Sequence, residues 1–311
     1  MLLPANTPPL LQRGLRWTGW LLGSVLLLLA WQFQLPALAL HGWRMGGDAA
    51  TDVPAQGLGL SHYRATIEAR PIEGIAANAS GLTFNPTTGT LFTVINRPAQ
   101  VAELTTDGQL LRLLPLAGVR DPEGITHVRD DLFIVADERT SRLHGVRIGT
   151  HTRTVHVEEG SGFDLPFKPL HNLGFEGVSW DGRDGTLYVA QEKWPLRVGT
   201  VRGLHASREP VAADPPEVSQ WQPSGFAALF LSDLSSLTVH EPTGSVLLLS
   251  DESALVVEYA ADGRPVGMLP LWRGFRGLAR TVPQPEGLAV GPGGAVYVVS
   301  EPNLFYRFER R

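Results

Sequence analysis

The 311-residue chain contains no cysteine. Disulfide bonds, thiolate metal sites and a cysteine nucleophile are therefore excluded, while the redox compartment stays open. The chain also lacks a strong charge of either sign, because 26 Lys and Arg residues stand against 31 Asp and Glu residues, a net charge of −5. No run of basic residues stands out from this balance, so we expect no nucleic-acid partner.

Several enzyme motifs are missing as well. The sequence has no Gly-x-Ser-x-Gly turn for a nucleophilic serine, no His-Glu-x-x-His zinc motif and no glycine-rich phosphate-binding loop. The nine histidines are scattered along the chain. The sequence therefore points to none of the common hydrolase or nucleotide-binding classes, and function has to be sought in its repeats.

The chain does have a short motif that returns five times. In most copies a glycine is followed by an aliphatic residue and a hydroxyl residue, and then come a turn and an apolar run. The aliphatic position is occupied by Leu82, Ile125, Val178, Leu237 and Leu288. The distance along the chain from one of these residues to the next is close to the roughly 40–50 residues of a four-stranded propeller blade. The repeat predicts an all-β domain, a five-bladed β-propeller over residues 61–311, with six blades as the alternative.

The first repeat shows how a blade is built. Strands are predicted at residues 81–85, 91–95, 100–104 and 109–116, with Asp-Gly at the turn before the last strand. The fourth repeat follows the same plan.

The last repeat stops after its third strand, residues 304–308. We expect residues 63–72 to supply its fourth strand, because pairing of the two chain ends removes the exposed sheet edges. Long insertions at residues 160–172 and 203–230 are expected to form loops.

Residues 1–60 differ in kind from the repeats. Arg13 and Arg16 precede a strongly apolar stretch of residues 17–31, so we expect residues 1–16 in the cytoplasm. We interpret residues 17–40 as a transmembrane anchor and residues 41–60 as a tether. The chain would then cross the inner (plasma) membrane once, with the propeller facing the periplasm or exterior. The alternative is a signal segment cleaved near Ala39, which would give a secreted domain.

Propeller geometry predicts where the acids gather. The innermost strand of each blade starts at one face of the propeller, and the second strand returns to that face. The residue before the first strand and the residue after the second strand therefore lie at the same mouth of the central channel. Before the first strand stand Ser80, Glu123, Glu176, Ser235 and Glu286, and after the second stand Asn96, Glu138, Glu192, Glu252 and Glu301. Neighbouring acids add to them, namely Asp121, Asp137, Asp233 and Asp251.

Such crowding is unfavourable unless something offsets it. Two carboxylates about 5–6 Å apart repel by roughly 3 kcal/mol at an effective dielectric of 20. Protons, hydrogen-bond donors or a cation can offset this, and oxygen ligands suit Ca²⁺, with Mg²⁺ or Mn²⁺ as weaker candidates. The candidate ligands are Glu123, Glu176, Glu286, Glu138, Glu192, Asp251, Glu252 and Glu301. Two alternatives stay open: a structural role, in which the acids bind backbone N–H groups or pair with bases such as Arg139, Arg142, Lys193 and Arg197, and direct acid–base catalysis.

The motifs resemble those of the SdiA-regulated, or YjiK/CarP-like, family over about residues 60–311. The resemblance is carried by Ser80-Gly81-Leu82-Thr83, Asp121-Pro122-Glu123-Gly124-Ile125, Asp137-Glu138-Arg139, Phe175-Glu176-Gly177-Val178, Gln191-Glu192-Lys193-Trp194-Pro195, Asp233-Leu234-Ser235-Ser236-Leu237, Ser250-Asp251-Glu252 and Pro285-Glu286-Gly287-Leu288. It implies a bacterial, exported propeller behind one membrane segment, with links to calcium responses and to phytase-like propellers. It implies no catalytic residue.

Three functions follow as hypotheses. The leading one is a membrane-anchored propeller that binds Ca²⁺ and acts as a sensor, a buffer or a ligand-binding module. The second is a metal-dependent hydrolase of a phosphoester or lactone, in which the cation polarises the substrate and activates water. The third is a protein-interaction scaffold that binds its partner on loops 160–172 and 203–230.

Overall fold

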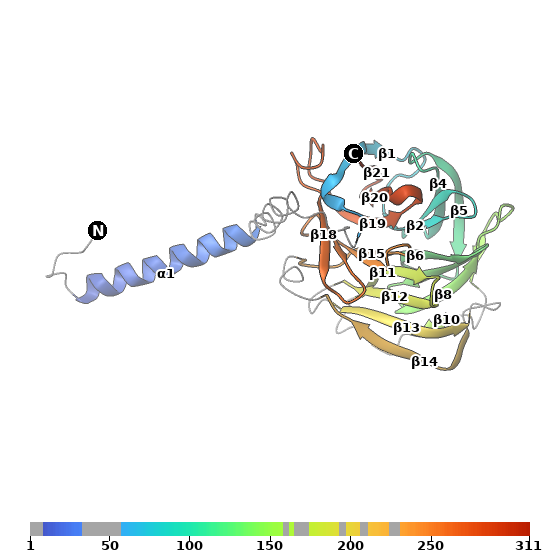
Figure 1. Cartoon of the computed structure of the whole chain (residues 1–311), viewed down its shortest axis with the longest axis horizontal. Coiled ribbons are helices and arrows are strands. Elements are labelled where there is room, and N and C mark those ends of the chain that lie inside the picture. The colour runs from blue at the N-terminus through green and yellow to red at the C-terminus, as the bar shows by residue number, and fades with distance from the viewer. Residues whose placement is uncertain are drawn as a thin grey trace. The chain divides into compact units, whose positions relative to one another are not determined.

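The computed structural model describes residues 9–32, 57–157, 162–164, 174–192, 197–205, 211–223 and 231–311. The chain divides into two units, Met1–Asp52 and Val53–Arg311. Each unit is described by itself (Figure 1).

The first unit contains the helix α1, Pro9–Gln32, 24 residues long. It includes the apolar stretch predicted at residues 17–31 and begins before it. Its apolar side chains are exposed, with Trp17 at 75% and Leu21 at 71% of their maximal surface. Within the residues described, no helix is both long and apolar enough to cross a membrane. Residues 33–56, which include the rest of the predicted anchor and most of the tether, lie outside the described residues.

The second unit is all-β, and its strands form five antiparallel sheets, here called blades 1 to 5 (Figure 1). Blade 1 contains β2 (Ala79–Asn85), β3 (Thr90–Ile95), β4 (Gln100–Leu104) and β5 (Leu110–Ala117). Blade 2 contains β6 (Pro122–Arg129), β7 (Leu132–Asp137), β8 (Arg142–Arg147) and β10 (Gly162–Asp164). Blade 3 contains β11 (Phe175–Asp181), β12 (Thr186–Gln191), β13 (Arg197–His205) and β14 (Val211–Trp221).

The last two blades follow the same order. Blade 4 contains β15 (Ser236–His240), β16 (Ser245–Ser250), β17 (Leu255–Tyr259) and β18 (Pro265–Pro270). Blade 5 contains β19 (Pro285–Val290), β20 (Val296–Ser300), β21 (Leu304–Arg310) and, from the other end of the domain, β1 (Tyr63–Pro71). The described elements also include two short 3₁₀ turns, η2 (Leu60–His62) and η4 (Pro292–Gly294).

Pairing of the two chain ends closes the ring. Strand β1 runs antiparallel to β21, with Tyr63 opposite Arg310 and Pro71 opposite Leu304. The predicted closure and the count of five blades are therefore confirmed, and the six-bladed alternative is wrong. The repeat already accounts for every sheet that the structure describes.

Two predictions about the outer strands were incomplete or wrong. Residues 203–230 are not one loop, because β13 extends to His205 and pairs with β14 as the outer hairpin of blade 3. From the insertion at residues 160–172 the structure describes only β10, which pairs with β8. In addition, β9 (Val155–His156) adds a parallel fifth strand to blade 1 beside β5. These are irregular parts of the chain, where no repeat indicates the pairing.

The five motifs form the innermost strands, and adjacent blades contact one another closely there. A Cβ atom on Gly124 would lie 2.8 Å from the backbone oxygen of Glu176, and one on Gly177 would lie 2.7 Å from the backbone nitrogen of Leu237. Real Cβ atoms do not approach so closely, so glycine is required where blade 2 faces blade 3 and where blade 3 faces blade 4. In blade 4 the corresponding residue is Ser236, whose hydroxyl accepts the backbone N–H of Leu288 in blade 5. The aliphatic residue that follows is buried in each blade.

The hydroxyl residue of the motif links blades 1, 2 and 3 each to the following blade. Backbone N–H groups of blades 2, 3 and 4 donate to Thr83 (from His127, 3.1 Å), Thr126 (from Trp180, 2.9 Å) and Ser179 (from Val239, 3.0 Å). The motif thus encodes contacts between blades as well as the fold within a blade.

A buried acid fixes the segment that leads into the propeller. In blade 1, Glu103 pairs with Arg112 on the neighbouring strand at 2.5 Å. The corresponding acid of blade 4, Glu258, faces Gly267 instead. Its fully buried carboxylate accepts a hydrogen bond from the backbone N–H of Leu58 at 2.8 Å. The chain before β1 therefore fills the space that a basic side chain occupies in blade 1.

The link between blades gives a first prediction. Thr126→Val keeps the side-chain shape but removes the acceptor of the Trp180 N–H, so we expect a loss of about 1–3 kcal/mol in the free energy of unfolding. Denaturant unfolding of the full-length chain measures it. The control is Thr66→Val, because Thr66 is an exposed residue that bonds to the Arg307 carbonyl oxygen. Equal stability of Thr126→Val and the unaltered chain would show that the motif hydroxyl is dispensable.

Candidate functional site

The predicted acids stand where strands begin and end at one mouth of the channel. Glu123 and Glu176 are the second residues of β6 and β11, the innermost strands of blades 2 and 3. Glu138 and Glu192 directly follow β7 and β12, the second strands of the same blades. The turn-and-return geometry of two adjacent blades therefore brings four carboxylates to one place.

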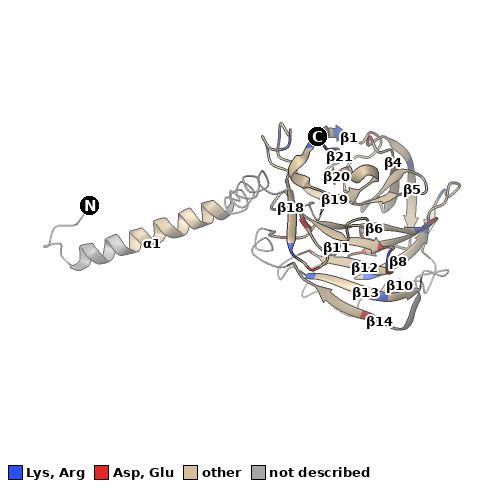
Figure 2. Cartoon of the chain, in the orientation of Figure 1, with Lys and Arg blue, Asp and Glu red and all other residues tan. Residues whose placement is uncertain are grey.

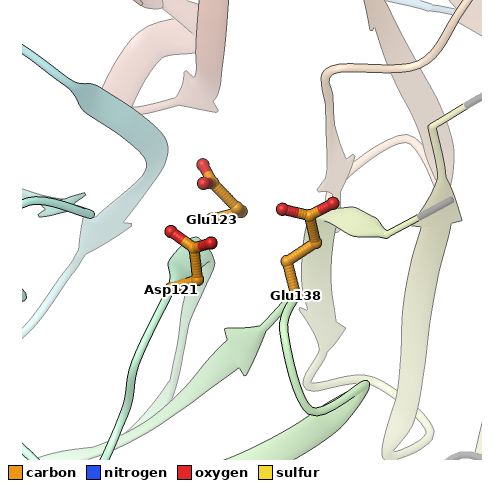
Figure 3. Close-up of side chains that lie close together, drawn as sticks. All are labelled: Asp121, Glu123 and Glu138. Atoms are coloured by element: carbon orange, nitrogen blue, oxygen red, sulfur yellow. The ribbon is translucent and has the colours of Figure 1, made fainter. Parts of the chain in front are cut away.

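Five carboxylates form two overlapping groups. Oxygen atoms of Asp121, Glu123 and Glu138 all lie within 4.8 Å of one another, and so do those of Glu138, Glu176 and Glu192. Figure 3 shows the first group, whose carboxylates project into a common space. Glu138 belongs to both groups and connects them. We call these five residues the acid cluster.

The other four predicted ligands stand at blades 4 and 5. Glu286 is the second residue of β19, Asp251 and Glu252 follow β16, and Glu301 follows β20. They join neither of the two groups found among the described residues. Their charges nevertheless reach the cluster, because Glu286 interacts electrostatically with both Asp251 and Glu123. The site is therefore lopsided toward blades 2 and 3.

Burial makes these carboxyls hard to ionise. It raises the pKa of Glu123 to about 7, and neighbouring acids add to the effect. Burial likewise raises the pKa of Glu176 well above its usual value, with repulsion from Glu123 as the next cause. The pKa of Glu286 rises to about 8, first through burial and then through Asp251. The pKa of Asp251 rises to about 6, again mainly through burial.

Hydrogen bonds offset only part of this cost. The side-chain amide of Asn96 donates to Glu123 Oε1 at 2.8 Å. Two blades have serine where the others have glutamate, and these serines bind backbone oxygens of the next blade. Ser80 donates to the backbone oxygen of Glu123 at 2.9 Å, and Ser235 donates to that of Pro285 at 2.7 Å. Each serine hydroxyl thus joins its blade to the next and contributes no charge to the channel mouth.

Basic residues neutralise the cluster weakly. Within the part of the domain that the structure describes, the basic side chains that carry a fixed charge are all arginines, and they are scattered over the blades (Figure 2). Arg97 lies 3.7 Å from Asp121 but is 75% exposed, so solvent screens the pair. Arg142, a base expected to pair with these acids, lies 2.9 Å from Asp164 instead. Lys193 falls outside the described residues. The structural alternative therefore loses one of its proposed pairings.

Two buried oxygens at the mouth have no hydrogen-bond donor. They are Oδ1 of Asn96 and Oδ1 of Asp121. Their side chains are held in place from the other side, Asn96 by its bond to Glu123 and the Asp121 loop by Asp137, which accepts the Asp121 N–H at 3.3 Å. Buried oxygens without donors are rare and need a partner. Oxygen ligands bind Ca²⁺ at about 2.3–2.6 Å, so oxygens that lie within 4.8 Å of one another can share one ion.

The family comparison agrees with the fold and the motifs. A family model described as SdiA-regulated matches residues 55–309. The chain belongs to the SdiA-regulated family. The resemblance noted from the motifs is thereby confirmed. The matched region contains the propeller and the few residues that come directly before it.

Solved structures with a similar fold are distant in sequence. Glutaminyl cyclase of Myxococcus xanthus is 15% identical, with a TM-score of 0.54 over 79% of this chain and 95% of its own. A gluconolactonase of Xanthomonas campestris is 12% identical, with a TM-score of 0.44 over 78% and 96%. At such low identity the likeness concerns the fold alone, so the site has to be judged on its own chemistry.

The raised pKa values predict how stability depends on pH. A carboxyl with a folded-state pKa above its unfolded value stabilises the fold below the unfolded pKa, and this stability is lost as the pH rises through the folded pKa. For Glu123 this stability is lost between about pH 4.5 and about pH 7. For Glu286 it is lost between about pH 4.5 and about pH 8. With EGTA present, we therefore expect the melting temperature to fall across this window.

The variant Glu123→Gln tests this assignment. Glutamine keeps an acceptor for Asn96 but cannot ionise, so the melting temperature at about pH 8 should rise and its pH dependence should weaken. Asp262→Asn, at an exposed turn of blade 4, is the control for removal of a negative charge. A lower melting temperature of Glu123→Gln at about pH 8 would mean that the carboxylate stabilises the empty site, contrary to the electrostatic argument.

Proposed function

We propose that the propeller binds a divalent cation, Ca²⁺ in preference to Mg²⁺ or Mn²⁺, in the acid cluster. The observation that carries the proposal is the acid cluster, in which Oδ1 of Asp121 is buried without a hydrogen-bond donor. A cation would satisfy that oxygen and remove the repulsion among the carboxylates.

The ligand types favour Ca²⁺ over other ions. The cluster offers carboxylate oxygens and, beside them, the amide oxygen of Asn96, with no thiolate in the chain. Hard oxygen ligands suit Ca²⁺, Mg²⁺ and Mn²⁺. Ca²⁺ accepts irregular shells of six to eight oxygens, whereas Mg²⁺ requires near-octahedral geometry. Carboxylates that come from two different blades fit the more tolerant ion.

Protons compete with the cation for the same oxygens. Since the pKa of Glu123 is about 7, this carboxyl is partly protonated at neutral pH and has to lose its proton when a cation binds. Affinity should therefore increase as the pH rises. Such coupling suits a sensor or buffer of Ca²⁺, the role that we propose for this site.

A hydrolase of phosphoesters or lactones is the second candidate. Carboxyls with pKa values of about 7 and about 8, as found for Glu123 and Glu286, can act as general base and acid near neutral pH. A bound cation would polarise the substrate oxygen. Turnover of generic phosphoesters and lactones separates this candidate from simple binding, which predicts none with or without metal.

We also propose that the N-terminal unit holds the chain at the inner membrane, with the propeller on the periplasmic side. The support is the helix α1, in which Arg13 and Arg16 come before the exposed Trp17, Trp20 and Leu21. Aromatic residues favour membrane interfaces, and basic residues favour the cytoplasmic side.

Calorimetric titration of the full-length chain tests the cation site. We expect saturable Ca²⁺ binding at about pH 8 that is tighter than Mg²⁺ binding, and weaker binding at about pH 5.5 because Glu123 is then protonated. Loss of two ligands in Glu123→Gln/Glu138→Gln should reduce the affinity by roughly tenfold or more, about 1.4 kcal/mol or more.

The matched control is Glu252→Gln. Glu252 stands at the same mouth but outside both groups, so its replacement should change the affinity by less than about threefold. Absence of Ca²⁺ binding by the unaltered chain would refute the proposal. An effect of Glu252→Gln equal to that of the double variant would refute the placement at blades 2 and 3.

Membrane fractionation tests the location. After alkaline extraction of cell membranes, the full-length chain should stay in the pellet, and external protease should cut the propeller only after the outer barrier is opened. A chain shortened at about Ala39 and found in the soluble fraction would instead support the cleaved signal segment.

A further inference from the structure

The other end of the channel opens into a cavity of about 930 Å³. It is lined by the far ends of the innermost strands and by the turns that follow them, so all five blades contribute to it. None of the acid-cluster residues lines it. The cavity is thus separate from the acidic mouth, and its volume lies in the roughly 300–1,000 Å³ range of small-molecule sites.

The lining carries balanced charges, because Arg129 and Arg310 stand against Asp130 and Glu241. Arg129 lies 3.3 Å from Asp130, and Glu241 accepts the backbone N–H of Gly182 at 2.7 Å. Burial lowers the pKa values of His127 and His240, which favours the neutral form of both imidazoles. Among the described residues, neither candidate metal group lies at this end. The cavity therefore lacks the charge that would select an anion or a metal ion.

Hydrogen-bonding groups of both kinds remain in the lining. The Nε2 atom of His127 lies 3.1 Å from the backbone oxygen of Asp130. A carbonyl only accepts, so Nε2 carries the proton and Nδ1 is left as an acceptor. The hydroxyls of Thr83 and Ser179 each accept a backbone N–H and retain a proton to donate. These groups can bind a ligand that both donates and accepts hydrogen bonds.

Apolar surface accompanies these groups. Trp180 and Phe84 line the cavity, and both are half-buried. Trp180 also packs against the core shared by blades 2 and 3, which fixes the orientation of its ring. An indole offers a flat apolar surface, and Trp180 belongs to the same lining as the hydroxyl residues Thr83 and Ser179. The rim is held in place as well, because Leu58, part of the lining, is bonded to the buried Glu258.

We propose that this cavity binds an uncharged saccharide, from one to a few sugar units in size. A sugar presents C–H groups to an aromatic ring and hydroxyls that both donate and accept. It carries no charge that the balanced lining would have to neutralise. A nucleotide would bring a net negative charge that a lining with balanced charges does not neutralise. The proposal is independent of cation binding, since the two sites share no residue.

Saturation-transfer NMR on the full-length chain tests the proposal, in a detergent without sugar groups so that the detergent does not compete. The probes are glucose, N-acetylglucosamine and maltotriose, with glucose 6-phosphate and glucuronate as charged analogues. We expect saturable binding of at least one neutral sugar, with weaker binding of the charged analogues. Saturation with none of the neutral sugars, or equal binding of the charged ones, would overturn the proposal.

Variants locate the binding. Trp180→Leu removes the flat ring, and His127→Phe removes the imidazole acceptor while it keeps a ring beside Phe133, whose centroid lies 5.0 Å away. Each should weaken sugar binding by roughly tenfold. The control Glu138→Gln changes the acidic mouth and should leave sugar binding unchanged while it weakens Ca²⁺ binding. Sugar binding that is lost in Glu138→Gln, or kept in both cavity variants, would overturn the assignment.

Discussion

The close approach of the innermost strands is the constraint on which the structure depends. Backbones of adjacent blades come so near that a Cβ on Gly124 would lie 2.8 Å from the Glu176 carbonyl oxygen. Glycine is therefore required, and the residue just before it is carried to the channel mouth beside its counterpart from the next blade. In blades 2 and 3 that residue is a glutamate. Tight packing of the innermost strands thus brings carboxylates close together at the mouth of the channel, where they repel one another.

The two ends of the channel differ in their chemistry. At one end carboxylates are partly buried, which raises the pKa values of Glu123 and Glu286 and leaves an oxygen of Asp121 without a donor. Such a site is costly when empty and gains stability when a cation occupies it. At the other end the charges are balanced and neutral polar groups predominate. One ring of strands therefore supports two sites with distinct ligand preferences.

Much of the fold follows from periodic features that are local in sequence. Turn residues, apolar runs and the repeated motif were enough to predict the strands of blade 1 to within two residues, and the unfinished last repeat predicted the pairing of β1 with β21. The outer strands were harder. The hairpin of β13 and β14 was taken for a loop, and the parallel strand β9 was missed. Edge strands contact few neighbours, so their sequences carry a weak pattern.

The sequence by itself determined the blade count, the closure of the ring and the mouth at which the acids stand, because these follow from repeat spacing and strand direction. Only the tertiary structure decided which acids meet: Asp121, Glu123, Glu138, Glu176 and Glu192 group together, while Glu286, Asp251, Glu252 and Glu301 do not join them. It also decided that Ser80 and Ser235 bond to the next blade and that a cavity opens at the far end. Distances between blades depend on side-chain packing across the whole ring, which no local pattern encodes.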